Sequence, residues 1–439
     1  MSSPTSGANA TSGGDRSRSG RGRANGRIAG LLPAILMAIG GFALAAALML
    51  VFVVVPANKV TPLDVDSLSV TEKDDATLLD SAAFASGKPT GDNAQKSECK
   101  PAEEAKPEEP AEGEDEPAED QAETPKENAV LPMSCFMSKV PLVSQRQVYG
   151  VEPGNKDETT FQAVQSVVRE DRLDAGDEKA ALVSATKDRV TLDRKTAEPV
   201  ADNNGSVELI DSGTTGEAPG DFHRDGLQYK WPFDPKNEDY PYFDQATFTT
   251  NPIHFKEESE VDGVKVNVYE QEIGPIDMYT SIGAHLQAIN PGFSQTTNSI
   301  LASYRIKGTA GAWGLPGDAA REVQMSRFYT NHRTIKVSKV TGRVLDGREE
   351  QFQFFAENQG EADQFWNDKT AVEQERNTPT RTAIDLVAQW DQPSIDRAVD
   401  SSNQSASRIN TFGRVLPISL GIIGFLFVIG GVLVARRRG

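Results

Sequence analysis

Two long apolar runs, one near each end of the chain, constrain its fold more than any other feature. They cover residues 31–55 and 415–435, and neither contains a charged side chain. A helix needs roughly 20 apolar residues to cross a bilayer core about 30 Å thick, so each run is long enough to span a membrane. We therefore predict transmembrane helices over 28–55 and 415–435.

Arginines flank both runs on the side of the nearer chain end: Arg16, Arg18, Arg21, Arg23, Arg27, Arg436, Arg437 and Arg438. Because arginine-rich flanks stay on the cytoplasmic side, we expect both termini in the cytosol and residues 56–414 outside a plasma membrane. Cleavage of the first run as a signal peptide is the alternative, but the run is longer than the roughly 7–15 apolar residues of such signals. Residues 1–27 are predicted to form a disordered basic tail, and 436–439 a short basic one.

The chain is acidic, with a formal net charge of −19, which disfavours nucleic acid as a partner. Much of this charge lies in residues 100–134, which hold twelve acidic residues, three lysines and six prolines and should form a disordered acidic loop. Cys99 and Cys135 frame the loop. An even cysteine count outside the cytosol favours a disulfide between them; two unrelated thiols are the alternative.

Apolar residues alternate with polar ones through much of the segment between the runs, which is typical of half-buried strands. Val264, Val266 and Val268 follow a turn signal at 262–263, so we predict a hairpin with residues 246–260. The stretch 335–354 is interpreted as strands with turns at 341–342 and 346–347, whereas 382–390 and 393–410 are predicted helices. The predicted fold class is α+β, with a β-dominated exported domain between two transmembrane helices.

The sequence carries no recognisable catalytic signature. Its four histidines are far apart, and no zinc-protease, nucleophile-elbow or phosphate-loop motif occurs. Two weak groups of possible metal ligands remain: Asp221, His223 and Asp225 in one, and Asp234, Asn237, Glu238 and Asp239 in the other. Because Asp and Asn are also ordinary turn residues, we predict no catalytic residue, no cofactor, no metal site and no enzymatic activity.

The densest aromatic stretch is WPFDPKNEDYPYFD, residues 231–244, whose rings are Trp231, Phe233, Tyr240, Tyr242 and Phe243. The prolines at 232 and 241 hold the preceding residues extended, so two short arms can pack their rings together. We interpret the stretch as a structural aromatic corner that locks the core. A contact surface for lipid or carbohydrate is the alternative.

Three segments, GLQYKWPFDPKNEDYPYFD, TLDRKTAEPV and IKVSKVTGRVL, carry a family resemblance. In combination they resemble an actinobacterial membrane-protein family of unknown function, often labelled "porin PorA family", over most of the chain. The resemblance implies a basic head, one helix, an exported and mostly β domain, a C-terminal helix and no catalytic residues. The layout of two terminal anchors around one β-rich domain is also similar to that of CD36-type scavenger receptors.

A function can be predicted from these features. A pore needs a polar lining, and both apolar runs are uniformly apolar, so we rank a pore, like an exported enzyme, below two other functions. The first is a bitopic cell-envelope protein whose exported domain binds or passes lipid or glycolipid between plasma membrane and outer envelope. The second is a non-catalytic scaffold or accessory subunit of an envelope assembly or transporter. Expected partners are membrane lipids around the two helices, envelope lipid or glycolipid, and other membrane proteins.

Overall fold

The computed structural model describes residues 21–100, 131–201, 204–211, 214–215, 222–289, 292 and 295–437. The chain divides into two compact units. One consists of the two terminal segments, up to Lys59 and from Ser407 onward, and the other spans Val60–Ala406. Each unit is described by itself below.

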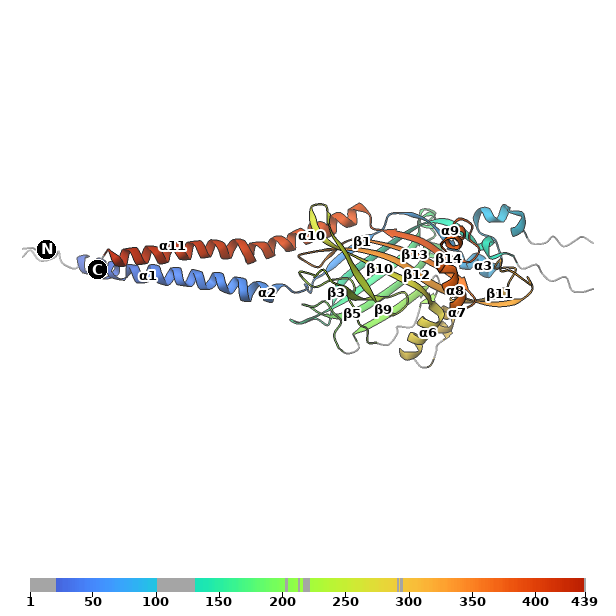
Figure 1. Ribbon diagram of the computed structural model, residues 1–439, viewed down its shortest axis with the longest axis horizontal. Helices are drawn as coiled ribbons and strands as arrows, with labels where there is room; N and C mark the ends of the chain where they lie inside the picture. Colours follow the sequence, from blue (N-terminus) through green and yellow to red (C-terminus); the bar gives the residue numbers. More distant parts are fainter. Residues whose placement is uncertain are drawn as a thin grey trace, which may run out of the picture. The chain divides into compact units, whose positions relative to one another are not determined.

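Apolar helices build the terminal unit (Figure 1). The first helical segment comprises α1 (Arg21–Met49), a π-helical turn (Leu50–Val54) and α2 (Val55–Asn58). The second comprises the last residues of α10 (Gln392–Asn410), most of which belongs to the other unit, a π-helical turn (Thr411–Val415) and α11 (Leu416–Arg436). Leu31–Asn58 and Gln392–Arg436 are long and apolar enough to cross a membrane, which indicates membrane association.

The helices α1 and α11 pack closely because glycines meet at their interface. A Cβ added to Gly40 would lie 2.5 Å from the Gly424 carbonyl oxygen, and one added to Gly431 would lie 2.9 Å from the Pro33 carbonyl oxygen. Small residues let membrane helices approach to this distance. The helix α1 begins at Arg21, inside the segment expected to be a tail; residues 1–20 lie outside the described residues.

One curled sheet dominates the other unit, and the described residues contribute fourteen strands to it. The predicted mixture of helices and strands, with strands in the majority, is confirmed. The sheet has the form of a half-barrel. The strands are β1 (Asp66–Val70), β2 (Asp74–Leu79), β3 (Met137–Val151), β4 (Glu158–Arg169), β5 (Leu182–Asp193), β6 (Gly205–Asp211), β7 (Thr214–Thr215), β8 (Tyr240–Asp244), β9 (Thr249–Val261), β10 (Val264–Asp277), β11 (Arg305–Thr309), β12 (Glu322–Ser338), β13 (Val344–Ala356) and β14 (Thr382–Gln389).

The strand order is β7-β6-β5-β4-β3-β2-β14-β13-β12-β10-β9-β8, with β1 beside β3 and β11 beside β12, and the paired strands are antiparallel. Residues 222–230 link the two ends of this order. Phe222 and Gly205 of β6 exchange backbone hydrogen bonds of 2.8 and 3.0 Å, and Leu227 bridges to Tyr242 of β8. The sheet and this linking segment together surround an interior.

Short helices lie along the sheet: α3 (Ser81–Ser86), α4 (Glu170–Asp174), α5 (Glu178–Ala181), α6 (Met278–Ile289), α7 (Gln295–Ala302), α8 (Gln359–Asn367) and α9 (Lys369–Asn377). Helices α8 and α9 begin at side-chain caps, since Asn358 and Asp368 each accept backbone hydrogen bonds. They cover one face of β13, where the Phe354 and Phe365 ring centroids lie 4.7 Å apart. The opposite face of β13 is turned to the interior.

Local sequence patterns predict some elements and fail at others. The predicted hairpin with its turn at 262–263 is confirmed as β9 and β10. The helix predicted over 382–390 is wrong, because this stretch forms β14 between β13 and β2. The turn predicted at 346–347 is also wrong. Gly347 lies within β13, where a Cβ would stand only 3.2 Å from Nε1 of Trp390, so the glycine serves close packing.

The disulfide predicted between Cys99 and Cys135 is present, and both cysteines are buried. Most of the predicted acidic loop, residues 101–130, lies outside the described residues. Its last residues are described: Met133 is buried and begins a short 3-10 helix, Met133–Phe136. The end of the segment expected to be a loop is therefore part of the core.

Candidate functional site

The aromatic residues singled out in the sequence lie beside the interior of the sheet. Trp231 is fully buried and stacks between Tyr242 and Tyr269, with 5.5 Å between ring centroids on each side. Tyr240 meets Tyr269 edge-on at 5.8 Å. Such offset and edge contacts suit the charge distribution of aromatic rings.

The other two rings of this stretch contact cations. Phe243 is buried, and the Arg224 guanidinium carbon lies 4.6 Å from its ring centroid. Phe233 is half-buried, with the Lys230 ammonium nitrogen 4.5 Å from its ring centroid. These distances are typical of cation–π contacts.

The first weak group of possible metal ligands is reduced to a pair. Asp221 lies outside the described residues, and His223 Nε2 lies 3.1 Å from Asp225 Oδ1. Elsewhere, Asp239 contacts His254 at 2.8 Å. Among the residues that the structure describes, no three His, Cys, Asp or Glu side chains are placed to hold a metal ion.

The remaining members of the second group form part of a turn. Asn237 donates a hydrogen bond of 2.7 Å to Glu258, and Glu238 lies 3.7 Å from the Lys236 ammonium group. Asp234 has a positive φ of 51°, a backbone conformation that aspartate tolerates. These contacts lie within and beside the turn formed by residues 234–239.

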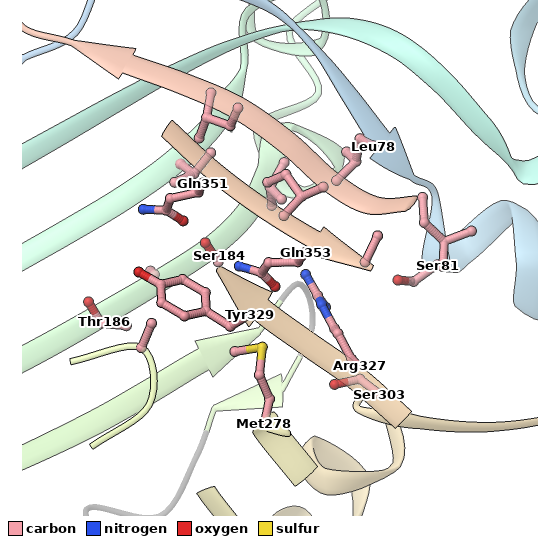
Figure 2. Close-up of a pocket in the computed structure, with 18 of the residues that line it drawn as sticks. Leu78, Ser81, Ser184, Thr186, Met278, Ser303, Arg327, Tyr329, Gln351 and Gln353 are labelled. Carbon is pink, nitrogen blue, oxygen red and sulfur yellow. The ribbon is translucent and has the colours of Figure 1, made fainter. Parts of the chain in front are cut away.

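A cavity of about 770 Å³ lies against the inner face of the sheet (Figure 2). Its size falls within the range of sites for small molecules, roughly 300–1,000 Å³. Strands β5, β12 and β13 supply much of the wall shown in the close-up, and α6 adds Met278. The residues labelled there from these strands are Ser184, Thr186, Arg327, Tyr329, Gln351 and Gln353.

This larger cavity is charged and more basic than acidic, although the whole chain is acidic. Its wall holds Arg146, Arg169, Arg172, Lys179, Arg327, Arg333, Asp80, Asp177, Asp244 and Glu349. The side-chain oxygens of two buried amides, Gln228 and Gln353, have no hydrogen-bond partner in the described structure. Buried polar atoms normally bind water or a polar group. The cavity is therefore suited to water and polar solutes.

A layer of paired charges lies in the wall of this cavity. Arg333 of β12 lies 3.0 Å from the Asp244 carboxylate at the end of β8 and 3.0 Å from the Glu349 carboxylate of β13. Arg146 of β3 lies 3.7 Å from Glu349, and Arg333 donates a 2.6 Å hydrogen bond to Gln271 of β10. We call Arg146, Asp244, Arg333 and Glu349 the charged layer.

Glu349 of the charged layer keeps its ionic form. Burial opposes ionisation of Glu349, but attraction to Arg333 and Arg146 and hydrogen bonds from Arg333 and Asn331 lower the pKa of its carboxyl to about 2. Burial and the nearby Asp244 carboxylate raise the pKa of the Tyr329 hydroxyl well above its usual value. Tyr329 therefore stays protonated and donates to Asp244 at 3.2 Å.

A second cavity, of about 120 Å³, adjoins the first. The two cavities share seven lining residues: Arg146, Gln165, Val167, Tyr242, Glu349, Gln351 and Leu386. Because Arg146 and Glu349 line both, the charged layer is part of the wall between the two spaces. Salt-bridged side chains, rather than packed apolar ones, thus contribute to this wall.

The sequence analysis does not single out the charged layer. One signal is present in the strand pattern. Arg333, Ile335 and Val337 are two residues apart, so they share one strand face, and the sequence predicts that Ile335 and Val337 face the core. A cation therefore lies on a buried strand face. Such a position demands a buried partner. The partners Asp244 and Glu349 are distant in sequence and could not be named from it.

The fold and the two cavities define a membrane-associated, β-rich protein with a charged interior. A family model described as Porin PorA matches residues 32–433. A protein named "Porin PorA" from Corynebacterium amycolatum is 34% identical over 404 residues, covering 92% of this chain and 97% of that protein. Another "Porin PorA", from Corynebacterium resistens, is 32% identical over 433 residues, covering 93% and 97%. The chain belongs to the Porin PorA family, and the resemblance noted from its sequence is confirmed.

The function predicted from the sequence is wrong in the light of these relatives. It ranks lipid or glycolipid passage first, a scaffold second and a pore below both, whereas the relatives are named porins. The error has a physical source, since the prediction considers only one possible lining for a pore. It tests only the two apolar helices and overlooks the charged and polar side chains on the inner face of the sheet. The family name agrees with the expectation of a protein that is not an enzyme.

Proposed function

We propose that this chain is a non-enzymatic porin that lets small polar solutes pass through the cell envelope, and that the two cavities inside the sheet form part of the path. The names of the relatives support a channel. The charged lining of the larger cavity supports polar rather than apolar solutes.

The observation that carries this proposal is the charged layer between the two adjoining cavities. Rings of charged side chains are a recurrent way to control passage through a pore. The pairs of Arg333 and Arg146 with Glu349 join strands β12, β3 and β13. We therefore expect movement of these side chains alone to change the passage between the cavities. No strand has to leave the sheet for this.

The outer surface of the sheet indicates which part of the chain meets lipid. Exposed residues at the β9 end include Lys256, Glu257, Glu258 and Glu260. Charges on a lipid-facing strand are destabilising, so we assign the membrane anchorage to the two apolar helices. In this arrangement lipids surround the helices, both arginine flanks lie in the cytosol, and residues 56–414 lie outside the plasma membrane.

A bulky residue placed in the larger cavity tests the path. Thr186 lines the cavity, whereas the next residue on β5, Lys187, is half-exposed and pairs with Glu208 at 3.6 Å. We expect Thr186→Trp to lower the conductance of full-length protein in planar lipid bilayers, because the indole occupies space that solutes need. Lys187→Trp, the matched control, should conduct like the parent.

Both variants are first checked by thermal unfolding, so that a folding defect is not mistaken for a blocked path. No conductance from the parent protein contradicts the porin proposal. Equal conductance of Thr186→Trp and the parent contradicts the assignment of the path to this cavity.

Topology is tested separately. Protease added to intact spheroplasts should cut within residues 101–130 and leave tags at both termini intact. Loss of either tag overturns the proposed orientation. Fractionation of the envelope then decides between the plasma membrane and an outer layer, and recovery in the outer layer refutes the plasma-membrane assignment.

A further inference from the structure

Two basic side chains stand opposite each other at the smaller cavity. Lys230 and Arg343 are partners in an antiparallel β-bridge, and both line this cavity. Like charges directly opposite each other in a sheet destabilise it. Lys230 is also buried, which raises the cost of leaving its charge without a counter-ion.

The contacts of Lys230 fix its position without cancelling its charge. Its ammonium group donates 2.6 Å hydrogen bonds to the carbonyl oxygens of Trp231 and Thr341. These acceptors are neutral. Burial, and then the charge of Arg343, lower the pKa of Lys230 to about 7. No carboxylate contributes to this shift.

Arg343 likewise lacks a counter-ion within the described part of the chain. Its backbone nitrogen contacts Thr341, but its guanidinium makes no hydrogen bond or ion pair to the described residues. Burial lowers the pKa of Arg343. Two neighbouring basic residues thus line one cavity, and no described carboxylate pairs with either. The Lys230 ammonium group also lies 4.5 Å from the Phe233 ring centroid, a contact that supplies no counter-charge.

The other charged groups around this cavity are already paired. Glu349 is held by Arg333 and Arg146, and Arg348 lies 2.9 Å from Glu350. The cavity wall also includes two tyrosines, Tyr229 and Tyr242, and burial raises the pKa of both hydroxyls, so neither supplies a negative charge.

Hydroxyl groups also line this cavity. Ser67 of β1 and Ser144 of β3 line the cavity, and their hydroxyls make no hydrogen bond to the described residues. Ser144 is buried, and its backbone nitrogen donates to the Thr71 hydroxyl at 2.9 Å, which fixes the local backbone. Hydroxyls are suitable donors to an oxyanion.

We propose that the smaller cavity is a binding site for a small free oxyanion of the phosphate or sulfate type, held between Lys230 and Arg343 and hydrogen-bonded by Ser67 and Ser144. The volume of about 120 Å³ restricts the ligand to a small ion. Arginine and lysine are the side chains that usually bind such anions. The site itself does not depend on the proposed function. Only a role for it in favouring anions along the path rests on that function.

Calorimetric titration of the full-length protein in non-ionic detergent with sodium sulfate tests the site. Sodium chloride at equal ionic strength measures the non-specific effect of salt. We expect Arg343→Gln to raise the sulfate dissociation constant on the order of tenfold or more, as expected for the loss of a hydrogen bond to a charged group. Lys339→Gln removes the same charge from a residue that pairs with Glu258 and should bind like the parent.

A milder variant keeps the test decisive if Arg343→Gln does not fold. Ser144→Ala removes one hydroxyl and should weaken sulfate binding several-fold while preserving the fold. Binding should also weaken as the pH rises through the Lys230 pKa of about 7, because sulfate favours the charged ammonium group. Sulfate keeps its own charge over this range.

The site is supported if the parent protein releases or absorbs heat on binding sulfate, if Arg343→Gln or Ser144→Ala loses this heat, and if Lys339→Gln keeps it. Absence of sulfate binding by the parent overturns it, as does equal binding by Arg343→Gln and Lys339→Gln. Either of these results leaves the bilayer conductance test with Thr186→Trp unaffected, so failure of the site and failure of the proposed function are distinguishable.

Discussion

Replacement of Trp231 by alanine should destabilise the protein strongly. The indole is fully buried and stacks on both faces, against Tyr242 and Tyr269, with ring centroids 5.5 Å away. Large-to-small changes at buried tryptophan cost about 3–5 kcal/mol. Two stacked partners lose their contacts together, so we expect the upper part of this range. A typical domain has only about 5–15 kcal/mol of stability in total.

Trp231→Phe provides the matched control. The buried indole nitrogen of Trp231 has no hydrogen-bond partner in the described structure, so its removal sacrifices no bond. Phenylalanine keeps a ring between the two tyrosines and should cost clearly less than alanine. Urea unfolding of the full-length protein in detergent, followed by tyrosine and tryptophan fluorescence, measures both variants. Equal midpoints for the parent and Trp231→Ala would refute the interpretation of this stretch as a core-locking corner.

Three further predictions concern the charged layer and the disulfide. Glu349→Gln leaves Arg146 without its carboxylate partner and Arg333 with Asp244 alone, and should cost about 3–5 kcal/mol in urea unfolding; no change would show that the layer is well hydrated. Because the Glu349 pKa is about 2 in the fold and 4.5 ordinarily, its stabilisation is complete above 4.5 and is lost as the pH falls toward 2. The parent should therefore lose more stability over this window than Glu349→Gln, and parallel curves would contradict the assignment. After cleavage within 101–130, the Cys99–Cys135 disulfide should hold the two fragments together on non-reducing gels, and fragments that come apart without reductant would contradict the bond. Replacing both cysteines by serine should lower the free energy of unfolding by about 3–4 kcal/mol, because the disulfide joins residues with a sequence separation of 36.

Sequence patterns predict elements well where a single face is buried and a turn signal is local. The alternation of Val264, Val266 and Val268 after the turn at 262–263 correctly predicts the β9–β10 hairpin, since both signals lie within one short stretch. The pattern fails at 382–390. A short apolar run of this length suits either a helix or a buried strand, and pairing with β13 and β2 decides for a strand.

The candidate site could not be predicted in the same way because its residues converge from distant parts of the chain. Arg333, Glu349, Asp244 and Arg146 lie on four strands. Arg333 alone carries a signal, its position on a buried strand face; the other three look like ordinary charges when taken alone. Phe352 and Phe354 illustrate the difficulty further, because they pack under α8 and α9 while Glu349 lies on the other face of the same strand.

The sequence by itself determines the two apolar helices, the cysteine pair and the β-rich character of the segment between the helices, because each depends on composition or on neighbours a few residues apart. Only the tertiary structure decides that the sheet curls and that residues 222–230 link its ends. It likewise decides which strand faces turn inward and that Lys230 meets Arg343 across a bridge. These features depend on strand order, and strand order is set by the burial of faces whose partners lie far away in the chain.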